Sequence, residues 1–519
     1  MTSTKIMAAE KAGELVRNGS TVLITGSGGG VMDADWIYAA LEKRYLETGE
    51  PKDLTLMHVT GIGDGREQGI NRFAHKGMVK RVIGGHWGWS PSMIRLALDN
   101  EIEAYNLPQG VLSGLTREIA AGRKGLLTSL GTKTFVDPRL QGGKLNEKIT
   151  EDLVSLVTLH GEELLFYKAF PIDVVIIRGT TADEDGNISV EQEAVDLDIL
   201  SSAQATYNSG GIVIAQVKRV ARRKTLHPRM VKVPGFMVDA VVVHPGQWQT
   251  SQEEYNPAFA GEIRVPLEAI QPLDFDIRKL VARRAALELE PDSVVNLGFG
   301  IADGVANIAA EEALIDDVVF TIEQGIVGGV PAKGAIFGAG YNPDMITDAP
   351  AQFDFYHGGG LDATFLGLAQ ADQYGNVNVS KFGNQLPGCG GFIDISQNAR
   401  EVIFCATFTA DGLRIAIEDG RLRILQEGKI QKFIPQVEQI TFSGEYAGEK
   451  GQRVLYVTER AVFELGAQGL ELTEIAPGVE LESDILAQMK FKPHIREPLA
   501  TMDARIFLPE KMGLWKEND

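Results

Sequence analysis

One carboxylate in this chain is placed where it could do chemistry. Glu323 directly follows an apolar, β-branched run from Val318 to Ile322, and Gln324, Gly325 and a glycine pair at 328–329 come after it. The run predicts a buried strand, and the glycines would let another molecule approach the backbone. Glutamate is seldom buried without a partner, so this placement favours a site. A glutamate that only caps a nearby turn fits the local pattern at least equally well. Other segments of the chain are therefore needed to distinguish a functional site from a turn cap.

A glycine-rich segment from Gly388 to Gly391 could supply the second part of a site. Its sequence, Gly-Cys-Gly-Gly, presents successive backbone amides without large side chains. Such amides can hold an oxyanion, although a plain crossover loop is the alternative. Cys389 has no histidine near it in sequence, so we do not expect it to be a nucleophile. His357, beside three glycines, is predicted to be a turn residue with a satisfied side chain rather than an acid–base group.

Composition excludes several classes of protein. The 519 residues suggest two to four domains, and the 44% hydrophobic and 23% charged residues are typical of a soluble globular protein. The net charge of 50 − 70 = −20 disfavours nucleic-acid binding. Two cysteines and eight histidines without ligand spacing predict neither a disulfide scaffold nor a metal site. Because no signal peptide or membrane-spanning run is evident, we expect a cytoplasmic protein without membrane contact.

The sequence repeats itself over a long period. Residues 16–28 resemble residues 289–301, and residues 173–190 resemble residues 362–379. From the glycine loop to the Gly-Asn turn there are 158 positions in the first half (Gly28 to Gly186) but 77 in the second (Gly298 to Gly375), so the first half carries a large insertion. The join is expected near 260–276, which gives domains 1–265 and 276–519.

The repeat predicts an α/β fold of two tandem, open domains. Alternating strand and helix patterns imply mainly parallel sheets covered by helices, with sites at the carboxyl ends of strands. The loop from Gly26 to Gly30 follows a strand and precedes a helix, but it does not fit the dinucleotide fingerprint GxGxxG. It is weak evidence for a nucleotide.

Together these motifs resemble the family I coenzyme A transferases. The resemblance rests on the tandem halves, the Glu323-Gln-Gly segment, the two Gly-Asn turns and the Gly388-Cys-Gly-Gly-Phe-Ile-Asp394 segment, and it covers nearly the whole chain. It is strongest to the single-chain branch that acts on short-chain acyl groups, including propionate, acetate, lactate and acetoacetyl-CoA transferases. The implied fold is the one shared with sugar-phosphate isomerases. The two halves would correspond to α-like and β-like subunits, fused into one chain.

The resemblance also implies roles for individual residues. Glu323 would attack acyl-CoA, as a carboxylate already ionised at pH 7, and form a covalent glutamyl-CoA thioester. Gln109, on the first-half insertion, and one glycine amide of the 388–391 loop would stabilise the oxyanion, with Gly390 or Gly388 favoured. Further contacts with CoA are expected from five positions: Gly298, Gly300, Gly338, Lys381 and Gly391.

The expected activity is therefore ping-pong transfer of CoA between a short-chain acyl-CoA and a carboxylic acid of the acetate, propionate, lactate, butyrate or acetoacetate class. An acyl-CoA hydrolase on the same scaffold and a non-catalytic CoA or sugar-phosphate binding protein are the alternatives. CoA and acyl-CoA would be substrates, with no permanently bound cofactor and no metal. Relatives of this branch imply a homodimer or a homotetramer.

Overall fold

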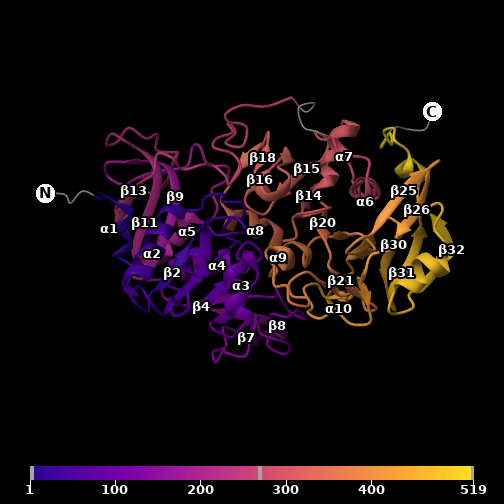
Figure 1. Ribbon diagram of the computed structural model, residues 1–519, viewed down its shortest axis with the longest axis horizontal. Coiled ribbons are helices and arrows are strands. Elements are labelled where there is room, and N and C mark those ends of the chain that lie inside the picture. The colour runs from indigo at the N-terminus through magenta and orange to yellow at the C-terminus, as the bar shows by residue number, and fades with distance from the viewer. Residues whose placement is uncertain (1–4, 267–271, 516–519) are drawn as a thin grey trace.

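Two large β-sheets, one from each half of the chain, form the frame of the molecule. The computed structural model describes residues 5–266 and 272–515. Elements of the first half lie at one end of the long axis and those of the second half at the other (Figure 1). Residues 267–271, within the segment where we predict the join, lie outside the described residues.

The first sheet is mainly parallel. Its strands follow the order β1-β13-β11-β9-β2-β3-β4-β5; the short β10 pairs antiparallel with β9, and β12 pairs antiparallel with β10. All residues of β9 are buried, as expected where helices cover both faces of a parallel sheet. The strand bounds are β1 Ile6–Met7, β2 Thr21–Ile24, β3 Leu54–His58, β4 Val79–Gly84, β5 Glu103–Asn106, β9 Val174–Asp183, β10 Ile188–Ser189, β11 Ile212–Ala221, β12 Val231–Val233 and β13 Ala240–Val243.

The second sheet repeats this plan. Its order is β19-β16-β15-β14-β20-β23-β29-β30-β31-β32, and the strands from β15 to β29 are parallel. The bounds are β14 Val294–Leu297, β15 Val319–Ile322, β16 Ile326–Val327, β19 Met345–Ile346, β20 Ala363–Gly367, β23 Glu401–Cys405, β29 Arg453–Val457, β30 Ala461–Gly466, β31 Gly469–Ile475 and β32 His494–Thr501.

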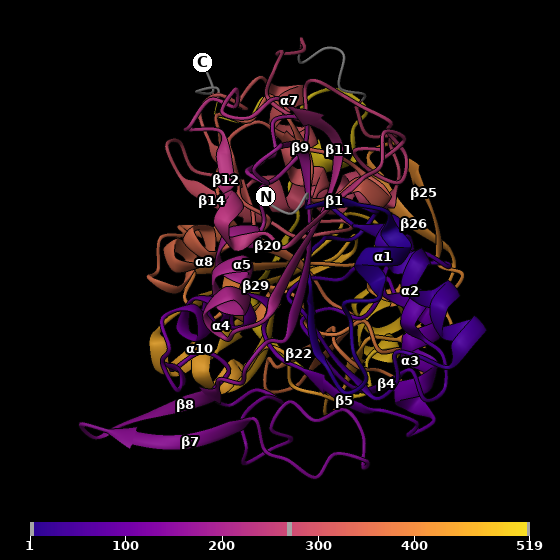
Figure 2. The same cartoon turned by 90° about the vertical axis from the view of Figure 1, so that its left-hand side faces the viewer.

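The structure also contains several sheets of two or three strands. In the first-half insertion, β7 and β8 form a hairpin that projects from one end of the molecule (Figure 2). The bounds of the small-sheet strands are β6 Gly125–Thr128, β7 Val154–Leu159, β8 Glu162–Lys168, β17 Val330–Pro331, β18 Gly340–Tyr341, β21 Gln370–Asp372, β22 Val377–Asn378, β24 Thr409–Ala410, β25 Arg414–Glu418, β26 Arg421–Gln426, β27 Ile430–Gln431 and β28 Phe433–Ile434.

Helices cover the sheets and bury their apolar faces. Val111, Leu112 and Leu115 of α4, for example, join the core cluster that also contains residues of β9 and β11. The helix bounds are α1 Ala9–Gly13, α2 Asp35–Thr48, α3 Pro91–Leu98, α4 Gln109–Ala120, α5 Ile199–Asn208, α6 Ile277–Ala286, α7 Gly304–Glu312, α8 Ala349–His357, α9 Phe392–Ser396 and α10 Gly444–Lys450.

The duplication is visible at the level of single hydrogen bonds. The Asp173 carboxylate accepts from the amide of Thr21 at 2.8 Å, and the Asp362 carboxylate accepts from the amide of Val294 at 2.9 Å. These bonds join β9 to β2 and β20 to β14, the matching central pairs. The predicted tandem α/β fold is thus confirmed, with parallel strands in the same order on both sides.

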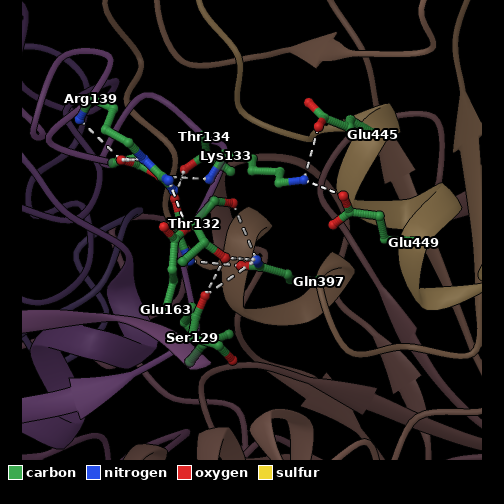
Figure 3. Close-up of polar contacts among 12 residues, drawn as sticks. Ser129, Thr132, Lys133, Thr134, Arg139, Glu163, Gln397, Glu445 and Glu449 are labelled. Carbon is green, nitrogen blue, oxygen red and sulfur yellow. Dashed lines mark hydrogen bonds and ion pairs between the residues drawn. The ribbon is translucent and has the colours of Figure 1, made fainter. Parts of the chain in front are cut away.

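Polar contacts tie the two halves together beside the sheets (Figure 3). Gln397, just after α9, accepts from the amide of Gly131 at 2.7 Å and donates to the carbonyl of Thr132 at 3.4 Å. Lys133 pairs with Glu445 at 2.9 Å and with Glu449 at 2.5 Å, both on α10. Loop residues of the first-half insertion therefore form hydrogen bonds and ion pairs with helical segments of the second half.

Candidate active site

A cavity of about 500 Å³ lies where the strand ends of the two halves meet. Loops after β2, β3 and β4 form one wall, and the loops after β14 and β15, the end of β20 and residues 387–392 form the other. Its lining includes, from the first half, Ser27, Gly28, Thr60, Gly61, His86, Trp89 and Gln109, and from the second half, Gly298, Phe299, Glu323, Gln324, Leu366, Gly367 and residues 387–392.

Glu323 lies at the end of β15, on the tight turn into β16. The amide of Gly325 donates to the carbonyl of Ile322 at 3.0 Å and closes this turn. Gly325 has φ +109°, and a Cβ there would lie 2.1 Å from the carbonyl oxygen of Thr347, so only glycine fits. The turn therefore fixes Glu323 at the carboxyl edge of the second sheet.

The environment of Glu323 disfavours the charged form of its carboxyl group. Its Oε2 is buried without a hydrogen-bond partner among the described residues, and its Oε1 accepts a bond of 3.3 Å from the side-chain amide of Gln324. Burial, with a smaller contribution from the nearby Asp394, raises the Glu323 pKa to about 7. The Glu323 carboxyl of the free protein is therefore harder to ionise than the ordinary glutamate expected from the sequence.

Gln109 begins α4 and is also buried in the cavity wall. Its backbone amide donates to the carbonyl of Gly390 at 2.9 Å, which ties the helix start to the glycine loop of the other half. Its side-chain Nε2 has no hydrogen-bond partner among the described residues. Gln109 thus carries an unsatisfied donor in the cavity that contains Glu323.

Asp394 caps the helix that begins with Gln109. Its carboxylate, which is fully buried, accepts from the amides of Gly110 at 2.9 Å and Val111 at 3.1 Å. A carboxylate at these first-turn amides stabilises a helix start, and in this protein it comes from α9 of the other half. His357, the last residue of α8, contacts the same carboxylate through Nε2 at 3.0 Å. The side chain of His357 is thus satisfied, as predicted.

The glycine loop has one free amide, but it is not one of those favoured from the sequence. The amide of Gly388 donates to Ser380 at 3.0 Å, that of Gly390 donates to Gly85 at 2.8 Å, and that of Cys389 donates to Asn106 at 2.9 Å. The Gly391 amide has no partner within residues 5–266 and 272–515. A Cβ on Gly391 would lie 3.4 Å from Cγ of Glu323, so Gly391 packs against the side chain of Glu323.

The expected CoA contacts are only partly brought together. Gly298 and Gly391 line the cavity, whereas Gly300, Gly338 and Lys381 are not among its lining residues. Gly300 donates to the Asp303 carboxylate at 3.4 Å, and Gly338 packs beside the side chain of Gln324. The Lys381 ammonium donates to the carbonyl of Leu145 at 3.2 Å.

Four aromatic residues of the cavity, His86, Trp89, Phe299 and Phe337, were not predicted from the sequence. His86 and Trp89 lie in the loop after β4, and burial lowers the pKa of His86 to about 4, so its imidazole is neutral. A signal was present, because residues 84–89 place glycines and aromatic rings directly after the apolar positions of residues 79–83. Cys389 lines the cavity too, but burial raises its thiol pKa well above the usual range, consistent with its expected lack of nucleophilicity.

Two other kinds of feature do not occur in the part of the chain that the structure describes. It contains no group of three or more His, Cys, Asp or Glu residues placed to hold a metal ion. It also contains no helix long and apolar enough to cross a membrane.

Comparison with known proteins identifies the family. The model of the family described as Coenzyme A transferase matches residues 5–244. Acetate CoA-transferase YdiF of Escherichia coli (strain K12) is 46% identical over 509 residues, covering 98% of this chain and 96% of that protein. Caffeate CoA-transferase of Acetobacterium woodii is 46% identical over 521 residues, covering 98% of each chain.

A solved structure has the same fold over the same extent. The acyl-CoA transferase YdiF of Escherichia coli O157:H7, in its thioester complex with CoA, matches with a TM-score of 0.94 at 45% identity and covers 98% of this chain and 97% of that chain. The chain therefore belongs to the coenzyme A transferase family and is an enzyme that transfers CoA between an acyl-CoA and a carboxylic acid.

Proposed function

We propose that Glu323 is the nucleophile of this transfer and carries CoA as a covalent glutamyl thioester. The observation that carries the proposal is the placement of this one carboxylate, with an unpaired oxygen, in the cavity between the halves. Near pH 7 part of the protein holds it as a carboxylate, which attacks an acyl-CoA without a general base. The solved relative in a thioester complex with CoA supports the same chemistry.

The reaction then runs in four balanced steps. The Glu323 carboxylate adds to the thioester carbonyl, the C–S bond breaks, and a mixed anhydride and the CoA thiolate result. The thiolate attacks the glutamyl carbonyl, forms the glutamyl-CoA thioester and releases the first acid as its carboxylate. A second carboxylate attacks this thioester, which again gives an anhydride and the thiolate. The thiolate finally attacks the new acyl carbonyl, so that acyl-CoA leaves and the Glu323 carboxylate is restored.

Each addition creates an oxyanion that needs hydrogen-bond donors. We propose the Gln109 Nε2 and the Gly391 amide, since both are unpaired at this cavity, whereas the amides of Gly388 and Gly390 are already used. One such donor contributes about 3–4 kcal/mol to transition-state stabilisation. Exclusion of water by the enclosing halves would protect the anhydride and the thioester from hydrolysis.

For the substrate we propose short-chain acids of the acetate, propionate, lactate, butyrate or acetoacetate class. The relative named acetate CoA-transferase supports this choice. His86 and Trp89 provide a neutral, aromatic wall for the acyl group. The cavity volume of about 500 Å³ lies in the usual range for a small-molecule site.

We also propose the domain bounds 1–265 and 276–519, because each large sheet takes its strands from one of these segments.

Steady-state kinetics test the proposed function. With acetyl-CoA as donor and propionate as acceptor, double-reciprocal plots at several acceptor concentrations are expected to give parallel lines. CoA is then held by the enzyme, and the first acid has left, before the acceptor reacts. Glu323→Gln is expected to lower the rate by about 10³-fold or more. Intersecting lines, or a Glu323→Gln variant with near-normal turnover, would contradict a covalent intermediate on this residue.

A further inference from the structure

Two successive residues, Glu323 and Gln324, line the active cavity at the end of β15. In a continuing strand their side chains would point to opposite faces of the sheet. The turn after Ile322 breaks this alternation. It is fixed by Gly325, whose amide donates to the carbonyl of Ile322 at 3.0 Å and whose carbonyl accepts from the amide of Thr347 at 2.8 Å. The fold thus brings a second polar side chain to the proposed nucleophile.

The side chain of Gln324 has one polar partner, and that partner is Glu323. Its Nε2 donates to Oε1 of Glu323 at 3.3 Å, whereas its own oxygen has no hydrogen-bond partner among the described residues. A buried glutamine that only links elements uses both ends of its amide. Gln247, for example, accepts from Gln216 at 3.2 Å and donates to Glu193 at 3.1 Å. The Gln324 amide therefore acts on the carboxyl group of Glu323 rather than as a structural link.

Packing holds the Gln324 side chain in this place. A Cβ on Gly338 would lie 3.3–3.4 Å from Cγ, Cδ and Nε2 of Gln324, and Gly338 has φ +112°. The loop between β17 and β18 thus packs directly on the glutamine side chain. Because Gln324 is only 6% exposed, its amide has little freedom to turn away from Glu323.

The proposed reaction forms oxyanions at two different carbon atoms, the acyl carbon of the substrate and Cδ of Glu323. When the CoA thiolate adds to the anhydride at Cδ, a C–S bond forms, the C–O bond to the acyl group breaks, and the first acid leaves with that oxygen. When the second acid adds to the thioester, a C–O bond forms, the C–S bond breaks, and the thiolate leaves. In both additions the electron pair rests on the remaining glutamyl oxygen until the leaving group departs.

We propose that the side-chain amide of Gln324 is the hydrogen-bond donor for the oxyanion at Cδ of Glu323, and that Oε1 is the glutamyl oxygen that remains. The inference rests on the proposed role of Glu323 as the nucleophile. Gln109 and the Gly391 amide then serve the oxyanion on the acyl carbon. A donor that already contacts the oxygen on which charge develops lowers the barrier to the addition.

Breakdown of the glutamyl thioester tests this role most directly, because an acylated Glu323 no longer has to ionise. Protein loaded with CoA from acetyl-CoA at pH 9 is mixed with saturating propionate, and the adduct is followed by rapid quenching and intact mass. Gln324→Met keeps a side chain of similar length but removes the N–H donor. Breakdown is expected to be about tenfold or more slower in this variant.

The pH dependence of kcat/KM for acetyl-CoA gives a second readout. Burial raises the pKa of Glu323 to about 7, and the bond from Gln324 opposes this by favouring the carboxylate. The midpoint of the profile is therefore expected to move to higher pH in Gln324→Met. Circular dichroism reports folding, and Gln324→Leu replaces this variant if it does not fold.

Gln247→Met is the matched control. Gln247 is also 6% exposed and donates to a carboxylate, that of Glu193, but it is not among the residues that line the active cavity. This control is expected to change neither the breakdown rate nor the midpoint.

Slower breakdown together with a higher midpoint in Gln324→Met alone supports the inference. Breakdown at the wild-type rate overturns it, as does a loss that Gln247→Met reproduces or a loss without a shift of the midpoint. If the wild-type protein forms no adduct on Glu323, the proposed function itself is contradicted, and the inference with it.

Discussion

At the scale of single residues, the surroundings of Glu323 favour reactivity over stability. A carboxylate that keeps an unpaired, desolvated oxygen is poorly stabilised as an anion, which is why burial raises its pKa to about 7. The same lack of solvation removes water that would otherwise have to leave before attack on a thioester. Two measurable pH dependences follow.

The first pH dependence is that of the reaction rate. Because the carboxylate is the attacking form, kcat/KM for acetyl-CoA is expected to rise with pH and to level off above a pKa of about 7. A pH–rate profile between pH 5 and 9, with the pH stability of the protein as control, measures this. A rate that is flat from pH 5 upward would mean that Glu323 titrates near the ordinary value for a glutamate.

The second pH dependence is that of the free energy of unfolding. A carboxyl whose folded-state pKa is about 7, above an unfolded value near 4.5, binds a proton in the folded state between these two pH values. Stability therefore falls as pH rises through this window and stays low above it. Glu323→Gln removes this effect and is expected to stabilise the protein by about 1–3 kcal/mol at pH 8 and by little at pH 4.5. Chemical denaturation at the two pH values measures it, and equal shifts at both would show that the buried charge of Glu323 is not the cause.

At the scale of elements, α9 of one half sets the position of α4 of the other. Asp394 caps the first turn of α4, which carries Gln109, and the carbonyl of Gly390 accepts from the Gln109 amide. The proposed donor and the proposed nucleophile come from different halves, so this contact fixes their relative placement. Asp394 also adds to the raised pKa of Glu323, after burial.

Asp394→Asn is therefore expected to lower kcat about tenfold or more and to move the kinetic pKa of the Glu323 step downward. Asp276→Asn is the matched control, because Asp276 likewise accepts from two first-turn amides, at 2.9 Å and 3.2 Å, on α6. Each variant is expected to lose no more than about 1–2 kcal/mol of stability. If both variants reduce kcat equally, or if only stability changes, Asp394 has no positioning role.

The elements themselves were largely predictable, and the contacts between them were not. The run before Glu323 predicts its strand because buried parallel strands read as β-branched stretches, and the structure begins that strand one residue later, at Val319. The free amide of the glycine loop could not be predicted, since it depends on Gly85 and Asn106 occupying its neighbours from the other half. The Asp394 cap joins residues 284 apart in sequence, and no local pattern encodes such a contact.

The raised pKa of Glu323 could not be predicted from the sequence, for a similar reason. Sequence places the carboxylate at a strand end, but its desolvation arises only when the two halves close around the cavity. An exposed strand end would have left an ordinary, ionised glutamate.

At the scale of the whole molecule, the two halves form one catalytic unit. The Gln397 and Lys133 contacts hold the insertion against the second half (Figure 3), and Gln397 follows Asp394 by three residues. If these contacts suffice, covalent continuity between the halves is dispensable.

Co-expression of residues 1–266 and 272–519 as separate chains is thus expected to give two polypeptides that co-purify through a tag on one of them and retain CoA transfer. Gln397→Ala combined with Lys133→Ala in the split protein is expected to weaken this association. Halves that elute separately, each folded by circular dichroism, would show that the connection itself holds them together.

The most direct test of the central claim is the intact mass of the protein after brief exposure to acetyl-CoA without an acceptor acid. We predict an adduct of CoA that maps to Glu323, is absent in Glu323→Gln, and disappears with formation of propionyl-CoA when propionate is added. Steady consumption of acetyl-CoA with no adduct, or an adduct on another residue, would contradict transfer of CoA through Glu323.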